Sequence, residues 1–243
     1  MPASETFTAS DGTSFPLVPV PFCHYCSMPL KDSFGSWGVC WRCNKRLREL
    51  SHEKPREVHD LPYNFTRAVA AGLYITDSPE KGSAGRLITA LKSGGGFSTV
   101  FAEAIAHVLR TRGPDITWDV IVPVPASLGK PFNPATTLAG DLGTVTHTRV
   151  EAALGLDASY ESGQGLPEGQ KFNNMREKVR IVRPNEVSGR KVLLVDDIMT
   201  TRGAAHWCSG VLLKAGATEV NVAVAGRSVD LRDLEFIGYA EHQ

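Results

Sequence analysis

The sequence has no excess charge of either sign, because 26 Lys and Arg residues balance 26 Asp and Glu residues among its 243. No overall field is therefore expected to attract nucleic acid, although a local basic patch stays open. No stretch reaches about 18 apolar residues, the length of a membrane span. The first residues, which include Glu5 and Asp11, have no apolar run of signal-peptide length. We therefore expect a soluble, cytoplasmic protein without membrane insertion.

The length exceeds one average domain, and the apolar share of 42% allows an ordinary core. We expect an extended or poorly ordered lead-in over residues 1–21, where Pro16, Pro19 and Pro21 oppose a helix. A small cysteine-containing module over residues 22–60 follows. From residue 61 to 243 the pattern is that of a larger α/β domain.

Cysteine is scarce, and an odd total of five argues against a secreted disulfide framework. Four of the five form two C-x2-C pairs separated by thirteen residues, namely Cys23, Cys26, Cys40 and Cys43. Two such pairs can place four thiolates around one zinc ion, and four protein ligands leave no open position, so the zinc would be structural. A module of about 40 residues buries too little surface to be stable alone, so the metal would also stabilise it.

Two other states of these cysteines stay open, namely two disulfides and four thiols without a metal. A cytoplasmic location makes both less favourable than zinc. His24, His52 and His59 are substitute ligands in principle, and we expect His24 to face solvent.

Residues 192–195 are apolar without alternation, as in a central strand of a parallel sheet that is covered on both faces. Asp196 and Asp197 follow where the carboxyl end of the strand is expected, the edge at which such sheets bind ligands. Carboxylates there can accept hydrogen bonds from sugar hydroxyls or hold magnesium. The next residues supply hydroxyls and backbone N–H groups at the start of a helix, which favours an anion, and they are Thr200, Thr201, Arg202, Gly203 and Ala204. A phosphorylated ribose fits this order.

The segment Val-Leu-Leu-Val-Asp-Asp-Ile-Met-Thr-Thr, residues 192–201, resembles the phosphoribosyl-pyrophosphate (PRPP) loop of type I phosphoribosyltransferases. The resemblance implies that Asp196 and Asp197 are the acids of the catalytic site, which bind the ribose hydroxyls, and that residues 200–204 bind the 5′-phosphate. The family usually has Gly directly after the two threonines, where this chain has Arg202. A backbone that approaches phosphate closely prefers Gly. Either Arg202 adds its charge to the phosphate, or the pocket is remodelled.

A second segment, Asp-Val-Ile-Val-Pro-Val-Pro at residues 119–125, predicts a short buried strand that ends in a turn fixed by prolines. Such a turn presents N–H groups to an anion, although an ordinary strand-ending turn is the alternative. In type I phosphoribosyltransferases a turn at this place binds pyrophosphate, and the Val-Pro-Val-Pro form resembles the ComF and GntX-like branch. By position the pyrophosphate loop would use Val124, Ala126, Ser127 and Lys130.

Two further loops are implied by the same resemblance. Residues 130–135 match a place where ComF relatives carry Arg-Gly-Phe-Asn-Gln-Ala, with Pro131 and Pro134 as departures that stiffen the loop. Pro134 suits the first turn of a helix that Asn133 caps. A glycine-rich segment between residues 150 and 178 would be the flexible loop that shields the reaction from water, with Gln170 and Arg176 as its polar residues. Residues 92–95 match a Lys-to-Gly turn of the family.

Periodicity predicts the remaining elements. Residues 69–76 and 219–225 read as strands, and helices are expected around Leu87–Leu91, from a cap at Ser98, and over residues 204–215. Cys208 lies on the core side of the last helix. Arg227, just after the last strand, is expected either to contact an acceptor or to lie on the surface.

The sequence thus predicts an α/β protein, with a Rossmann-like parallel sheet of the type I phosphoribosyltransferase kind and a small N-terminal zinc module. The resemblance implies PRPP as ligand, magnesium and structural zinc as cofactors, and displacement of pyrophosphate by an acceptor that no residue identifies. The ComF likeness also implies a link to competence, with single-stranded DNA or DNA-processing proteins as partners, and a homodimer stays open. The alternative is a non-catalytic nucleotide- or single-stranded-DNA-binding accessory protein, which Arg202, Pro131 and Pro134 favour.

Overall fold

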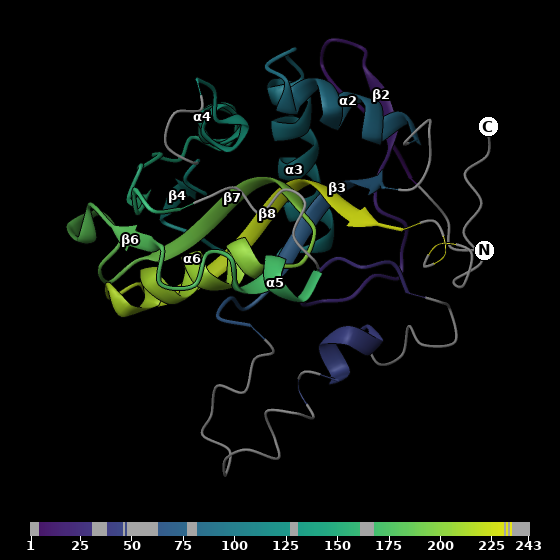
Figure 1. Ribbon diagram of the computed structural model, residues 1–243. Coiled ribbons are helices and arrows are strands. Elements are labelled where there is room, and N and C mark those ends of the chain that lie inside the picture. The colour runs from purple at the N-terminus through teal and green to yellow at the C-terminus, as the bar shows by residue number, and fades with distance from the viewer. Residues whose placement is uncertain are drawn as a thin grey trace.

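A central parallel sheet organises the computed structural model, which describes residues 5–30, 38–45, 47, 63–76, 82–126, 131–160, 168–230, 232 and 234 (Figure 1). The strand order is β3-β8-β7-β4, and every neighbouring pair is parallel. These strands are β3 (Ala68–Ile75), β4 (Val120–Pro123), β7 (Lys191–Met199) and β8 (Glu219–Val229). Their nearly continuous burial is what parallel strands with two covered faces require.

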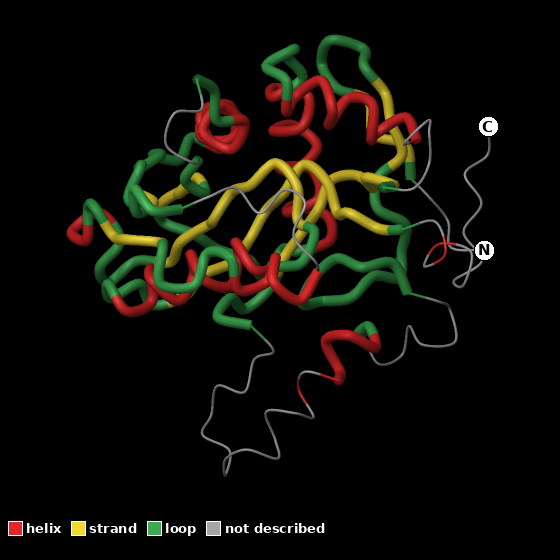
Figure 2. The backbone as a smooth tube through the Cα atoms, viewed as in Figure 1, coloured by secondary structure: helices red, strands yellow, loops and turns green. Residues whose placement is uncertain are grey.

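Helices cover both faces of the sheet and give three layers (Figure 2). One face carries α2 (Gly82–Lys92), α3 (Ser98–Arg112) and α4 (Pro134–Thr146), whose apolar residues form one core with Leu193 and Val195. The other face carries α6 (Gly203–Lys214) and the short α5 (Glu168–Asn173), and its core includes Val192 and Leu194. Successive residues of β7 point to opposite cores, so the parallel sheet is covered by helices on both faces. The predicted α/β class is therefore confirmed.

Smaller elements lie around these layers. A 3-10 turn spans Pro184–Glu186, and the two antiparallel ribbons are β1 (Thr6–Thr8) with β2 (Ser14–Pro16), and β5 (Leu154–Leu156) with β6 (Val179–Ile181). Among the described residues, no helix combines the length and the apolar character needed to cross a bilayer.

Most predicted elements are present, with shifted ends. The strand over residues 192–195 continues through both acids to Met199, and the last strand continues to Val229. Asn133 caps α4 and Pro134 begins it, as expected. Ser98 is not a cap: Phe97 holds that position with φ 67° and makes no side-chain cap bond. The Ser98 hydroxyl instead donates to Asp141 of α4, because a tertiary partner is within reach.

The described part of the lead-in contains two extended strands and is ordered. Its β1–β2 hairpin packs on α2 and α3 through Phe15, which is 1% exposed and lies 5.1 Å from the ring of Phe101. The side chain of Arg112 in α3 donates to the Val18 carbonyl and to the Glu5 carboxylate. Apolar burial thus orders the hairpin although the prolines exclude a helix.

The cysteine module packs against the α6 face of the sheet. Its four cysteines belong to the same apolar core as Val222 and Val224 of β8. The Ser27 hydroxyl donates to the Ala68 carbonyl of β3 at 2.8 Å, which fixes the first cysteine pair to the sheet. A helical segment over residues 41–45 begins directly after Cys40 and carries Cys43.

Candidate functional site

The two adjacent acids lie where β7 outruns its neighbour β4. The last register pair of these strands is Pro123 with Val195, and the Val124 N–H still donates to the Val195 carbonyl. Asp196 and Asp197 come next, and among the described residues β8 is the only strand beside them. After Pro123 the chain turns instead of continuing as a strand beside β7. This leaves the carboxyl edge open beside the acids.

The acids have different surroundings although they are consecutive. The Asp197 carboxylate lies 4.0 Å from the Lys92 amine at the end of α2, and this pair is the only ion pair of Lys92 that the described residues form. Asp196 accepts a hydrogen bond from the Asp197 N–H at 2.9 Å. Burial raises the pKa of Asp196 well above its ordinary value, and the charge of Asp197 adds to the rise. The edge therefore pairs one carboxylate that has a cation beside it with one that resists ionisation.

Three other segments reach the same edge. Asn133 donates to the Val124 carbonyl at 3.0 Å, which joins the start of α4 to the proline turn after β4. The ring of Phe132 lies next to Gly94, because a methyl group placed on that glycine would be 3.8 Å from it. The half-buried Ala126 belongs to the proline turn, whereas Ser127 and Lys130 lie outside the described residues. The proposed pyrophosphate loop and the Lys92–Gly95 turn are thus brought to one place.

The expected phosphate loop connects the end of β7 to the start of α6. Thr200 is exposed and Thr201 is half-buried, and the Gly203 N–H lies 3.5 Å from the Thr201 hydroxyl oxygen. Helix α6 begins at Gly203, so the loop ends on the unpaired N–H groups of a helix start. This arrangement has the hydroxyls, donors and helix dipole that bind an anion.

Arg202 lies buried at the start of α6. It caps α6 with φ 69°, a left-handed conformation that Gly adopts more easily. Its side chain is buried, and its guanidinium lies 5.8 Å from the centre of the Tyr63 ring. The side chain thus packs on the cysteine-module side, and the loop keeps its backbone and hydroxyl donors for a ligand.

The expected flexible segment is partly helical. Gln170 is exposed on α5, and Arg176 is exposed with its guanidinium 5.7 Å from the Trp207 ring of α6. The Trp207 indole N–H donates to the Phe172 carbonyl at 2.8 Å, so α5 rests on α6 beside the loop. A methyl group on Gly203 would lie 2.4 Å from the same Phe172 oxygen. The structure therefore brings α5 to the phosphate loop, while the side chains of Gln170 and Arg176 lie on its outside.

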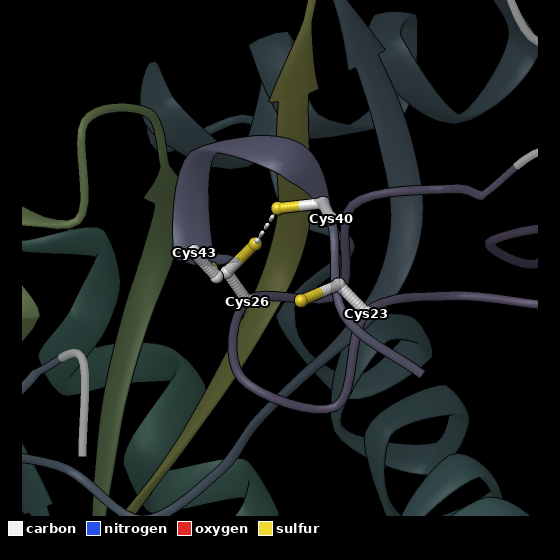
Figure 3. Close-up of side chains that lie close together, drawn as sticks. All are labelled: Cys23, Cys26, Cys40 and Cys43. Atoms are coloured by element: carbon white, nitrogen blue, oxygen red, sulfur yellow. Dashed lines mark hydrogen bonds between the residues drawn. The ribbon is translucent and has the colours of Figure 1, made fainter. Parts of the chain in front are cut away.

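The four cysteines of the module form one buried cluster (Figure 3). Their Sγ atoms all lie within 4.8 Å of one another, and those of Cys26 and Cys40 are 3.6 Å apart. Four thiolates at about 2.3 Å from a tetrahedral zinc are about 3.8 Å from one another. All four are free thiols, so the disulfide alternative is not what the structure shows. The donor set fits a structural zinc site, and His24 is exposed, as expected.

Three residues near these two sites were missed or misplaced from sequence. Lys92 was noted only within a family-like turn, and its distance to Asp197 depends on how α2 packs. Tyr63, whose hydroxyl is 3.9 Å from Cys43, carried no local signal. Arg227 is neither a surface residue nor an edge contact: it is 1% exposed and inside the core. Its position shortly after the apolar run of residues 222–225 was the available signal.

No family model and no curated protein matches this chain. Solved structures with a similar fold include a Bacillus subtilis glutamine PRPP amidotransferase, at 18% identity and a TM-score of 0.36, over 61% of this chain and 29% of that one. An adenine phosphoribosyltransferase is 16% identical over 63% of this chain and 81% of its own, with a TM-score of 0.39. Another, from Thermoanaerobacter pseudethanolicus, is 12% identical over 58% and 86%, with a TM-score of 0.38.

The chain spans less than a third of the amidotransferase that it matches. Likenesses of this size do not assign a function. The fold and the two sites define an α/β protein with a four-cysteine centre on one face of its sheet and a polar carboxyl edge.

Proposed function

We propose that the carboxyl edge of the sheet binds PRPP, or a related phosphorylated ribose, together with magnesium in the cytoplasm. The observation that carries the proposal is the position of Asp196 and Asp197 beyond the end of β4, with the loop to α6 directly after them. A ribose held by the acids would have its 5′-phosphate within reach of the donors at the start of α6. The sequence resemblance to the PRPP loop supports the same order.

Each segment of the edge then has a role. Asp196 and Asp197 orient the ribose through its hydroxyls, and residues 200–204 bind the 5′-phosphate. Lys92 and the proline turn at Val124 and Ala126 face the pyrophosphate. In a transfer, the bond from the anomeric carbon to the pyrophosphate oxygen breaks and a bond to the acceptor forms. Magnesium, when bound, stabilises the charge on the leaving pyrophosphate.

The second candidate is a binding protein without turnover, acting on a nucleotide or on single-stranded DNA as a competence accessory. The backbone of Arg202 favours it, because this residue has a left-handed conformation at the position where the PRPP loops of type I phosphoribosyltransferases usually carry Gly. A loop fixed in this conformation would bind phosphate but would not make the loop movements that a catalytic cycle requires. The acceptor, the DNA partners and a homodimer all belong to the part of the proposal that experiments must decide.

Calorimetric titration with PRPP and magnesium tests the binding. We expect saturable binding, and Asp197→Asn should weaken it by about 10–100-fold, since hydrogen bonds to a charged group contribute about 1.5–3 kcal/mol. Asp115→Asn is the matched control, because that exposed carboxylate lies before the amino end of β4 and should leave affinity unchanged. No binding, or equal binding by Asp197→Asn, contradicts the proposal. Release of pyrophosphate with a panel of bases and amines then separates a transferase from a binding protein.

A further inference from the structure

Two buried arginines lie between the cysteine cluster and the loop after β7. Arg227 is 1% exposed and Arg202 is 7% exposed. Among the described residues, neither has a carboxylate within ion-pair distance, and the Arg202 Nη1 and Arg227 Nε atoms have no hydrogen-bond partner. Burying a guanidinium without an anion is costly. Some other negative group must therefore compensate these two cations.

Arg202 reaches the cysteine cluster through Tyr63, because its guanidinium lies 5.8 Å from the centre of the Tyr63 ring and the Tyr63 hydroxyl is 3.9 Å from the Cys43 Sγ. Burial lowers the pKa of Arg202, but Tyr63 and the thiols of the cluster outweigh it and raise that pKa above its ordinary value. Burial lowers the pKa of Arg227, and the nearby charges act on it in both directions: Cys26 and Cys40 raise it, whereas Arg202 and Arg42 lower it. Arg227 lies on β8, which runs behind the four thiols in Figure 3. Both guanidiniums are thus within the electrostatic range of the cluster.

The charges match if the cluster holds zinc. Four thiolates around one zinc ion carry two net negative charges, and two guanidiniums neutralise them. We propose that Arg202 and Arg227 are the counterions of a tetrathiolate zinc centre and that, through them, the centre positions the loop between β7 and α6. They are positioning residues, because they do not ligate the metal.

The second half of this proposal rests on backbone contacts of the same two side chains. The Arg227 Nη1 donates to the carbonyls of Met199, Thr200 and Ser228 at 2.5, 2.8 and 2.8 Å. The Arg202 Nε lies 3.1 Å from the Thr201 carbonyl. Three consecutive carbonyls, those of residues 199–201, therefore accept from the two arginines. Whatever holds the guanidiniums in place also holds the start of the loop.

Loss of the metal has a defined consequence in this arrangement. Without zinc, nothing holds the four sulfurs together, so the cluster loses the fixed arrangement beside the arginines. Arg202 and Arg227 would then lose the group that compensates their burial, and they would move toward solvent. The carbonyls of residues 199–201 would lose their donors at the same time, so the loop would open. If the proposed function holds, binding of the phosphorylated ribose would depend on zinc.

Hydrogen exchange on the full chain tests the link without any variant. Zinc-loaded protein and protein stripped by a chelator are compared at the amides of residues 199–206. We expect faster exchange there in the stripped protein, with the β4 and α4 amides unchanged, and recovery when zinc is restored. Equal exchange of residues 199–206 in the two forms would overturn the link between the centre and the loop.

Metal affinity tests the two arginines. Zinc affinity is measured by competition with a chromophoric chelator, and cobalt substitution reports the tetrathiolate by its absorption. Arg227→Met and Arg202→Met should each weaken zinc binding by about 10–100-fold, as loss of groups around metal ligands does. Arg227→Lys should recover part of the loss, since it keeps the charge. Equal affinity in both methionine variants would refute the counterion role.

Arg190→Met is the matched control for these variants. Arg190 also donates to a backbone carbonyl, that of Glu186, but it lies just before β7, at the opposite edge of the sheet. Its loss should leave zinc affinity unchanged. Should the methionine variants fail to fold, the exchange experiment on the unmodified chain still decides. Neither readout uses PRPP, so a chain that shows zinc-dependent loop exchange but binds no PRPP would contradict the proposed function and leave this inference standing.

Discussion

The environment of Asp196 conflicts with its charge. Its pKa is raised first by burial and then by Asp197, so the folded protein favours the protonated form. Because the folded state binds this proton more tightly than the unfolded state, protonation of Asp196 stabilises the fold. This contribution is fully present below the ordinary pKa of 3.8 and is lost as the pH rises through the folded-state pKa. As the pH rises, the tendency of Asp196 to ionise therefore lowers the free energy of unfolding.

Asp196→Asn should consequently raise the melting temperature at pH 8, and the gain should shrink toward pH 4. Asparagine keeps the oxygen that accepts from the Asp197 N–H, so the backbone contact is retained. Thermal unfolding of both proteins across this pH range is the measurement. A gain that is constant with pH would mean that the charge of Asp196 is not the cause.

Sequence reasoning succeeded for residues whose signal is local. The apolar run before Asp196, and Asn133 followed by Pro134, define their elements within a few positions, and the two C-x2-C pairs define a cluster by spacing alone. It left the direction of Arg202 open and did not predict the burial of Arg227, because both depend on a module about 160–200 residues earlier in the chain. It failed for Ser98 for the same reason, since Asp141 of α4 competes with the helix start for the hydroxyl.

At the scale of elements, the contact of α5 with α6 depends on one glycine. Gly203→Ala would place a methyl group 2.4 Å from the Phe172 carbonyl oxygen, so α5 must move away or α6 must start later. We expect a loss of about 1–3 kcal/mol in the free energy of unfolding, the usual cost of overpacking. Urea denaturation measures it.

Gly140→Ala is the control, because that exposed glycine of α4 has nothing within 4 Å of the added methyl group. There the same change should stabilise by about 0.5–1 kcal/mol, since alanine is the better helix former. Equal effects of the two substitutions would show that α5 does not rest on Gly203 in solution.

Asn133 joins α4 to the turn after β4 through two hydrogen bonds. Its oxygen accepts from the Ala135 N–H, and its amide donates to the Val124 carbonyl. Asn133→Ala loses both bonds and should cost about 2 kcal/mol, whereas Asn133→Asp keeps the cap and should cost about 1 kcal/mol. Denaturation curves of the two variants give the comparison, and an alanine variant as stable as the aspartate variant would argue against the cap.

At the scale of the whole molecule, the N-terminal hairpin is part of the core. Phe15 is 1% exposed, and its ring lies close to Phe101 and beside Gly72. Phe15→Ala should therefore lower the free energy of unfolding by about 3–5 kcal/mol. The half-buried Phe7 on the same hairpin is the control, and Phe7→Ala should cost clearly less. Equal, small losses would indicate that the hairpin does not pack on α3.

The proposed zinc centre also has a consequence for the order of events during synthesis. Its ligands are made early, but Arg202, Arg227 and strand β8, against which the thiols pack, are made more than 150 residues later. Long-range contacts of this kind form late in folding. A nascent chain that ends before β7 would hold its metal weakly, so stable uptake of the ion should coincide with completion of the sheet.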